Sequence, residues 1–198
     1  MKHRVVLLFG SFNPPTNAHM SMAIKAHEFY PDADIIFVPA HSNYLRDSKG
    51  VRRTFSATCI DRAELLQKAC APYMKVSRYE MNNEKASKTY DTLRSFDGYA
   101  EKILALGADN IEELTTWYRW AELVRENKFL VFSRNGHKLL PKALVPYKDN
   151  FRCVTNDYPD VSSTKVRYAC KFRDYAYVFK ACPYPVYRYL FEHADYFE

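Results

Sequence analysis

The first nineteen residues constrain the fold more than any other stretch of the chain. An apolar run from Val5 to Phe9 stops at Gly10, is followed by the turn residues Pro14 and Pro15, and gives way to a helical pattern near Ala18. A short apolar run bounded by turn residues is typical of a strand that is buried on both faces, as strands of parallel sheets are. The chain is therefore expected to begin with a strand, a polar turn and a helix.

Four polar side chains surround the expected N-terminus of that helix: Ser11, Asn13, Thr16 and His19. Backbone N–H groups at a helix N-terminus favour phosphate, so the turn is predicted to be a nucleotide-phosphate site. Helical side chains tilt toward the helix N-terminus, and this direction places His19 beside Thr16, three residues earlier. A lone histidine is more often structural, but this setting favours a functional role.

Composition limits the class of protein. The chain has 198 residues, enough for one domain with a sizeable core, and no apolar run approaches the ~20 residues that span a bilayer. The start Met-Lys-His-Arg leads into a strand, so we expect no signal peptide. The five cysteines are odd in number and widely spaced, which favours reduced thiols in a cytoplasmic protein.

The formal charge of +6 and the sixteen tyrosines raise the alternative of nucleic-acid binding. The basic residues are scattered, however, and Arg52-Arg53 is the only adjacent pair. We therefore expect a solvated surface with a few anion contacts, and neither a nucleic-acid nor a membrane partner. A homo-oligomer is compatible with the sequence.

Strand and helix patterns alternate along the rest of the chain. Further strands are expected at residues 35–38, 74–76, 103–106, 129–132 and 151–154. Helices are expected at residues 18–30, 56–70, 88–93 (capped by Ser87 or Thr89), 117–126, from 162, and 185–193. This order predicts an α/β fold with a doubly wound, mostly parallel sheet in a single domain, residues 1–198, with a helical C-terminal part from about residue 162.

Three polar groupings fall near the expected sheet. The hydroxyls of Ser162, Ser163 and Thr164 could cap a helix or, with Arg167, surround a polyphosphate. Capping is favoured for the segment alone; the phosphate turn at the N-terminus shifts the balance to phosphate binding. A basic segment, residues 41–53, could close over an anion or form a surface loop.

The third grouping follows the strand at residues 103–106. Gly107 lies at a strand end, where ligands bind in open α/β sheets, and Asp109 could accept hydrogen bonds from ribose hydroxyls. Trp117 and Trp120 are three residues apart, so on one helix they would face similarly. One could belong to the core and the other could form a stacking platform for a flat heterocycle.

Together these segments resemble a known family. Residues 10–19, Gly-Ser-Phe-Asn-Pro-Pro-Thr-Asn-Ala-His, resemble the (H/T)xxH loop of the nucleotidyltransferase superfamily, and residues 161–167, Val-Ser-Ser-Thr-Lys-Val-Arg, resemble its ISSTxxR motif. With residues 89–93 and the segment 107–120 in register, the chain is similar to nicotinate mononucleotide adenylyltransferases over nearly its full length. The resemblance implies a Rossmann-like nucleotidyltransferase fold, an activity that joins ATP and nicotinate mononucleotide in NAD biosynthesis, and Mg²⁺ carried with ATP without a protein metal site.

The resemblance also implies roles for individual residues. The implied catalytic residues are Thr16, His19 and Arg167. The implied ATP-binding residues are Gly10, Ser11, Phe12, Thr16, His19, Gly107, Asp109, Ser162, Ser163, Thr164 and Arg167. The implied mononucleotide-binding residues are Asn13, Arg46, Thr89, Trp117, Tyr118 and Arg134, with Trp117 stacking on the pyridine ring.

The chain departs from the usual bacterial pattern at several positions. Asn13, Thr16 and Ala18 stand where Asp, His and Gly are usual, and Tyr44-Leu45 stands where Pro-His is usual. Asn13 and Thr16 resemble eukaryotic-type members that accept nicotinamide mononucleotide, so the choice between acid and amide stays open. The sequence is also compatible with a sister nucleotidyltransferase, such as a pantetheine-phosphate adenylyltransferase or a cytidylyltransferase, and with a non-catalytic nucleotide- or RNA-binding module.

Overall fold

Six parallel strands form the centre of a computed structural model that describes residues 2–41, 61–85, 87–133, 140–158, 160–194 and 196–197. Within these ranges the strands lie in the order β3-β2-β1-β4-β5-β6. Their bounds are β1 Lys2–Gly10, β2 Asp34–Pro39, β3 Met74–Val76, β4 Tyr99–Gly107, β5 Lys128–Ser133 and β6 Phe151–Thr155. This is the Rossmann order, with the switch point between β1 and β4. The expected fold class is confirmed, and every pairing is parallel.

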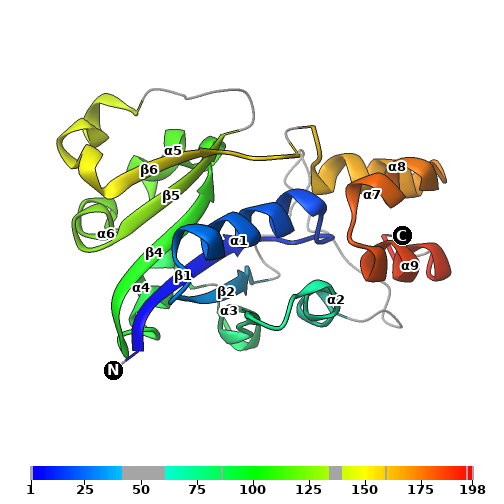
Figure 1. Cartoon of the computed structure of the whole chain (residues 1–198), viewed down its shortest axis with the longest axis horizontal. Coiled ribbons are helices and arrows are strands. Elements are labelled where there is room, and N and C mark those ends of the chain that lie inside the picture. Colours follow the sequence, from blue (N-terminus) through cyan, green and yellow to red (C-terminus); the bar gives the residue numbers. More distant parts are fainter. Residues whose placement is uncertain are drawn as a thin grey trace.

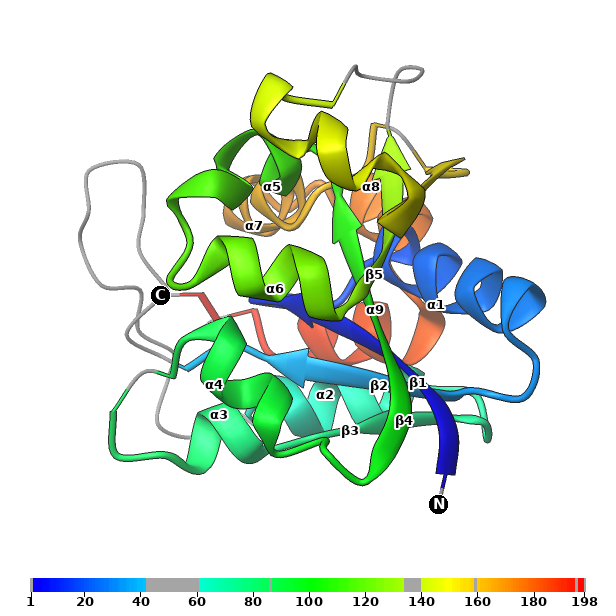
Figure 2. The same ribbon diagram turned by 90° about the vertical axis from the view of Figure 1, so that its left-hand side faces the viewer.

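Helices cover both faces of the sheet (Figures 1 and 2). Their bounds are α1 Asn17–Phe29, α2 Arg62–Ala69, α3 Tyr79–Asn82, α4 Thr89–Arg94, α5 Ala108–Glu113, α6 Trp120–Glu126, α7 Ser163–Lys171, α8 Tyr175–Ala181 and α9 Tyr184–Glu192, with 3-10 turns η2 Leu114–Thr116 and η3 Lys142–Asn150. None of the helices in the described part of the chain has the length and apolar character needed to cross a bilayer.

Alternate residues of β1 point to opposite faces, as the strand period of two requires. Val5 and Leu7 join the core beneath α4, α5 and α6, which lie on the side turned to the viewer in Figure 2. Val6 and Leu8 join a second core that contains residues of α1 and Leu66 of α2. The central strand is therefore buried on both sides, which explains its unbroken apolar run.

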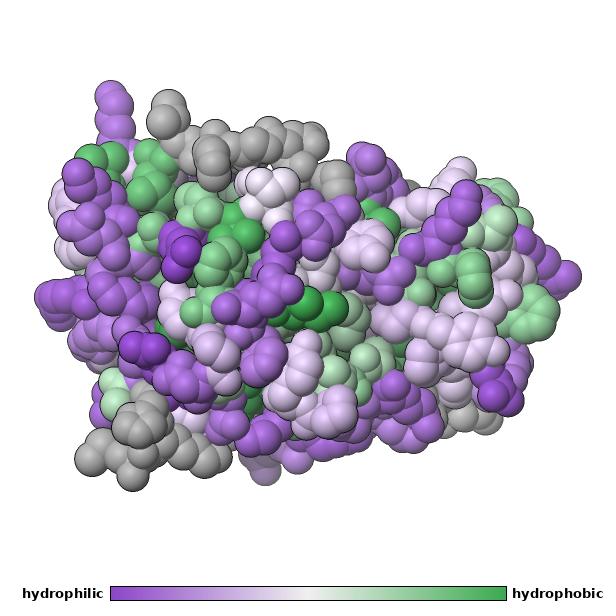
Figure 3. All heavy atoms as spheres, viewed as in Figure 1, coloured by the Kyte–Doolittle hydropathy of each residue, from purple (hydrophilic) through white to green (hydrophobic). Residues whose placement is uncertain are grey.

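Helices α7, α8 and α9 pack on α2 through a third apolar cluster at one end of the molecule (Figure 1). Val166, Val178, Val186 and Leu65 are fully buried in it. The outer surface of this end shows pale and green atoms among purple ones in Figure 3. Its exposed aromatic side chains include Tyr168, Phe172, Phe179, Tyr184 and Phe191.

Two expectations about helices are wrong. The helix expected from Trp117 begins at Trp120, because Arg119 takes the left-handed conformation (φ 53°) and separates η2 from α6. Trp117 and Trp120 therefore do not share a helix face. The N-cap of α4 is Lys88, without a side-chain cap, while the hydroxyl of Ser87 accepts a hydrogen bond from Asn83.

Other differences concern helix extent and number. The helix expected at residues 56–70 begins, in the part that is described, at Arg62; residues 56–60 lie outside that part. Helices α3, α5 and α8 and the turn η3 were not expected from periodicity. Three of them have seven residues or fewer, so they span too few turns to show a clear apolar period.

Candidate active site

In the turn between β1 and α1, a hydrogen bond to the N-cap residue of α1, Thr16, orients the His19 ring. The Thr16 N–H donates to His19 Nδ1 at 3.0 Å, and the Thr16 hydroxyl lies 2.9 Å from the same nitrogen. An N–H can only donate, so Nδ1 must accept, and the proton of a neutral imidazole is assigned to Nε2. His19 therefore has a donor nitrogen on the side of the ring away from Thr16.

Phe12 is the strained residue of this turn. Its φ is 45°, in the left-handed region, which costs a side chain about 1–2 kcal/mol. Its ring is 2 % exposed and lies edge-on to the rings of His19 and Phe37 at 5.0 and 5.3 Å. A Cβ at Gly10 would approach this ring to 3.1 Å, so Gly10 is needed for the close approach.

Helix α7 brings the second motif against the first. Arg167 Nη1 donates to the Asn13 carbonyl at 2.6 Å, and the Ser163 hydroxyl donates to the Pro14 carbonyl at 2.8 Å. Arg167 Nη2 also donates to the Thr164 hydroxyl at 2.9 Å. Ser162 is the N-cap and accepts from the Lys165 N–H, so capping and loop contacts occur in the same motif.

Two polar residues of this turn are almost completely buried. Thr16 is fully buried and Asn13 is 1 % exposed. The N–H and hydroxyl of Thr16 contact His19. The predicted contact of Thr16 with phosphate stays a prediction. The Asn13 Oδ1 has no hydrogen-bond partner among the described residues.

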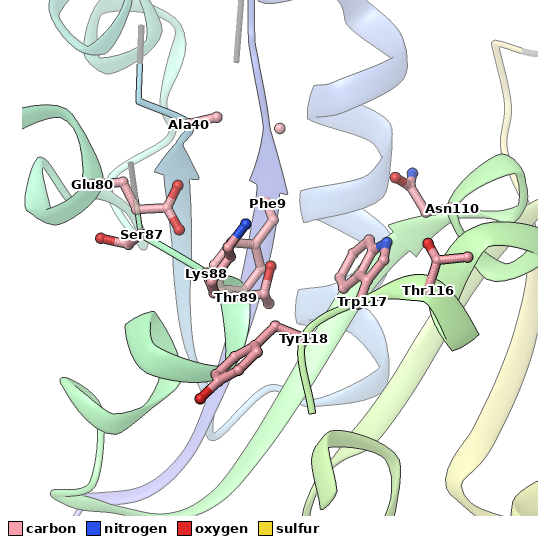
Figure 4. A pocket seen from close by; sticks show the side chains of 11 residues that line it. Phe9, Ala40, Glu80, Ser87, Lys88, Thr89, Asn110, Thr116, Trp117 and Tyr118 are labelled. Carbon is pink, nitrogen blue, oxygen red and sulfur yellow. The ribbon is translucent and has the colours of Figure 1, made fainter. Parts of the chain in front are cut away.

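A pocket of about 410 Å³ lies at the carboxyl ends of β1 and β2, beside the first turn of α4. A pocket of this size suits a small molecule. Figure 4 shows Thr89 and Trp117 facing each other across it, with Tyr118 at one side. These three residues were predicted to bind the mononucleotide, and the structure brings them together.

Five polar residues of the pocket were not predicted as site residues: Glu80, Ser87, Lys88, Asn110 and Thr116 (Figure 4). Lys88 and Asn110 are sequence neighbours of predicted residues, so proximity along the chain could have indicated them. Nothing in the sequence marks Glu80, which α3 supplies.

The remaining predicted residues lie elsewhere or outside the description. Gly107 ends β4 and Asp109 is exposed in the first turn of α5; neither lines this pocket. Arg46 and Arg134 lie outside the described residues.

Two buried charged residues lie at the pocket: Glu80 lines it, and Arg62 bonds the carbonyl of the lining residue Ala40. Arg62 is 2 % exposed and donates to the carbonyls of Ser11 and Ala40; burial lowers its pKa to about 10, opposed by Tyr196, Asp61 and Glu80. Glu80 is 4 % exposed and accepts from the Thr92 hydroxyl at 2.7 Å. Burial raises the pKa of Glu80, and its hydrogen bonds and Arg62 offset only part of this rise. Sequence reasoning missed Arg62 as well.

No cluster of three His, Cys, Asp or Glu side chains suited to a metal occurs in the described ranges. The expectation of Mg²⁺ delivered with ATP stays a prediction.

A parallel sheet in Rossmann order, with two motifs meeting at its switch point, defines a nucleotidyltransferase-type fold. The chain belongs to the cytidylyltransferase-like family, whose sequence model matches residues 7–169. The expected family and enzyme class are confirmed by relatives with more specific names.

Among these relatives is a protein of Aliarcobacter butzleri, 35 % identical over 169 residues, which cover 83 % of this chain and 86 % of the relative. Another, from Methylacidiphilum infernorum, is 28 % identical over 201 residues, covering 98 % and 92 % of the two chains. Both are named "Probable nicotinate-nucleotide adenylyltransferase".

A solved structure shares the fold over the whole chain. The Plasmodium falciparum nicotinic acid mononucleotide adenylyltransferase complexed with NaAD aligns with a TM-score of 0.76, 18 % identity and 98 % coverage of both chains. At this identity the likeness concerns the fold.

Proposed function

We propose that this chain transfers the adenylyl group of ATP to nicotinate mononucleotide, giving deamido-NAD and pyrophosphate. The observation that most supports it is the meeting of α7 with the first turn, where Arg167 and Ser163 bond the carbonyls of Asn13 and Pro14 beside His19. The pocket lined by Trp117 and Thr89 lies next to this turn, because Gly10, where the turn begins, also lines the pocket. The names of the relatives point to the same reaction.

In the proposed reaction a 5′-phosphate oxygen of the mononucleotide attacks the α-phosphorus of ATP in line. The bond between that phosphorus and the bridging oxygen breaks, and pyrophosphate leaves with the electron pair. The attacking phosphate is already ionised at neutral pH, so no general base and no nucleophilic side chain are needed. Catalysis then consists of positioning and of stabilising charge in the transition state.

His19 and Arg167 supply the charge stabilisation in this proposal. Because Nδ1 of His19 accepts from Thr16, the donor of its ring is Nε2–H, and this group would donate to a phosphate oxygen. Arg167 presents a fork of donors, which suits phosphate. Trp117 would stack on the pyridine ring and Thr89 would face it across the pocket.

We propose that Mg²⁺ enters with ATP and is held mainly by phosphates and waters. The donor chemistry of the described residues fits this arrangement, because they offer no carboxylate cage and Mg²⁺ readily keeps several waters. When bound, the ion would neutralise charge on the polyphosphate.

A cytoplasmic location is also proposed. Cys70, Cys153, Cys170 and Cys182 are free thiols, as is usual for proteins of reducing compartments.

The acceptor is the open part of the proposal, because Asn13 and Thr16 also fit an enzyme that prefers nicotinamide mononucleotide. The test measures pyrophosphate release from Mg-ATP with either mononucleotide at equal concentration. We expect the acid to react faster; faster reaction of the amide would identify the other acceptor.

Two controls address the other classes. Pantetheine phosphate with ATP, and CTP in place of ATP, test for sister transferases. Release with none of these acceptors, together with salt-dependent retention of an oligonucleotide, would contradict the proposal and indicate a binding module.

A further inference from the structure

We propose that Arg62 is a positioning residue for the transfer reaction. Its guanidinium holds the two chain segments that border the mononucleotide pocket and carry the turn of His19. This inference rests on the proposed function and adds to it a residue from outside both sequence motifs.

Arg62 joins the ends of two neighbouring strands. It is the first residue of α2, and its guanidinium donates to the carbonyls of Ser11 and Ala40. These residues follow β1 and β2, which pair as far as Gly10 and Pro39, and the Ala40 N–H donates to the Gly10 carbonyl at 2.9 Å. Gly10 and Ala40 both line the pocket, so Arg62 fixes part of its wall.

The carbonyl of Ser11 is next to the strained residue Phe12. Arg62 bonds the peptide group before Phe12, and Arg167 bonds the Asn13 carbonyl, one peptide group beyond the one that follows Phe12. Two arginines from different helices therefore hold the chain on both sides of the left-handed Phe12. Strained backbone persists only where surrounding contacts determine it. The Phe12 ring lies against the ring of His19, so release of the Ser11 carbonyl would change the support of His19.

The bond also sets the direction of a backbone donor. In a trans peptide the N–H of one residue points opposite to the carbonyl of the residue before it. With the Ser11 carbonyl turned toward Arg62, the Phe12 N–H points away from the buried guanidinium. The same bond keeps a carbonyl oxygen from turning outward, where it would repel phosphate.

Stability alone explains Arg62 poorly. Burying a charge is costly, and replacing buried charges with apolar residues of similar volume is often neutral or stabilising. Arg62 nevertheless is 2 % exposed, with its guanidinium bonded to two carbonyls. Orientation of those carbonyls explains the placement better.

The experiment compares Arg62→Met with Leu65→Ala. Leu65 lies on the same helix, is fully buried, and packs in the cluster of α7, α8 and α9, so its truncation tests the effect of destabilising α2. Pyrophosphate release and thermal unfolding are measured for each full-length chain, with assays well below the unfolding temperature. We expect kcat to fall at least about 10-fold in Arg62→Met. Leu65→Ala should lower the unfolding temperature and keep the wild-type kcat.

Arg62→Lys gives a readout that a purely structural role would leave unchanged. An amine has a lower ordinary pKa than a guanidinium, and burial at this position lowers it further. We expect kcat of Arg62→Lys to decline relative to the wild type between about pH 7 and about pH 9, as the amine loses its charge. The fraction of folded protein is followed by circular dichroism at each pH.

The outcomes separate the inference from the function it rests on. Wild-type turnover together with an unchanged kcat in folded Arg62→Met, or a wild-type pH profile in Arg62→Lys, would overturn the role of Arg62 alone. No turnover by the wild-type chain with any acceptor would overturn the proposed function and this inference with it.

Discussion

Arg167 Nη1 donates a 2.6 Å hydrogen bond to the backbone carbonyl of Asn13, which lies 154 positions earlier in the chain. The bond ties α7 to the turn after β1, at the switch point of the sheet. The two motifs of the family thus form one structural unit before any ligand is considered.

Arg167→Lys tests this unit. A single amine cannot reach the Asn13 carbonyl and the Thr164 hydroxyl as the guanidinium fork does. We expect a loss of kcat of about 10²-fold, measured by pyrophosphate release. Arg188→Lys is the control, because Arg188 is exposed and pairs with Glu192; a similar loss there would contradict the assignment.

Two substitutions of His19 distinguish its contribution to stability from its contribution to kcat. In His19→Asn the amide oxygen can replace Nδ1 as the acceptor for the Thr16 N–H, while the Nε2 donor is lost. We expect near-native stability and a loss of kcat of about 10²-fold or more. His19→Ala should lose activity and also about 1 kcal/mol of stability, since the helix start loses its acceptor. Thermal unfolding and turnover check both variants, and wild-type turnover in either would contradict the role.

Gly10 is predicted to be intolerant of a methyl group. A Cβ there would lie 3.1 Å from the Phe12 ring, which supports His19. We expect Gly10→Ala to cost about 1–3 kcal/mol of stability and to lower kcat. Gly98→Ala is the control, because a methyl group at Gly98 would meet no described atom within 4 Å. Chemical denaturation of both variants measures the difference, which should vanish if the Phe12 packing is unimportant.

Substitutions at Trp117 and Trp120 can be compared directly. Both pack against the same core cluster, but Trp117 lines the pocket and Trp120 does not. Trp117→Leu should raise KM for the mononucleotide, since the loss of stacking on a base costs about 1–3 kcal/mol. Trp120→Leu should lower stability and leave KM unchanged. Steady-state kinetics decide this, and equal effects on KM would show that the pocket does not bind the ring.

The raised pKa of Glu80 predicts that the free energy of unfolding depends on pH. Burial raises its pKa in the folded state above the ordinary value of 4.5, so the folded state binds more protons than the unfolded state at pH values between these two pKa values. The free energy of unfolding should therefore be highest below the ordinary pKa and should decline as pH rises through the folded-state pKa. Glu80→Gln keeps an acceptor for Thr92 and removes this decline. Denaturation curves of both proteins at several pH values test the difference, and parallel pH profiles would contradict it.

The sequence by itself determined the strands and the positions of the two motifs. Unbroken apolar runs such as Val5–Leu8 reflect burial on both faces of a parallel sheet, and that signal is local. The short strand at residues 74–76 was also predicted correctly, and the helix after Ser162 was predicted from the hydroxyl residues at its start. The hydrogen bond between Arg167 and the Asn13 carbonyl was not predicted and was found only in the structure.

Only the tertiary structure decided the remaining features of the site. The left-handed conformation of Arg119 prevents the helix expected from Trp117. The sequence did not predict this, because such a rare backbone conformation has no signature in side-chain periodicity. Arg62 and Glu80 belong to helices whose sequences show no motif. Glu80 lines the pocket and accepts a hydrogen bond from Thr92, and Arg62 bonds the carbonyls of Ser11 and Ala40, which are distant in sequence. Local patterns encode which residues are apolar and where helices begin, whereas the partners of buried charges depend on how the helices pack.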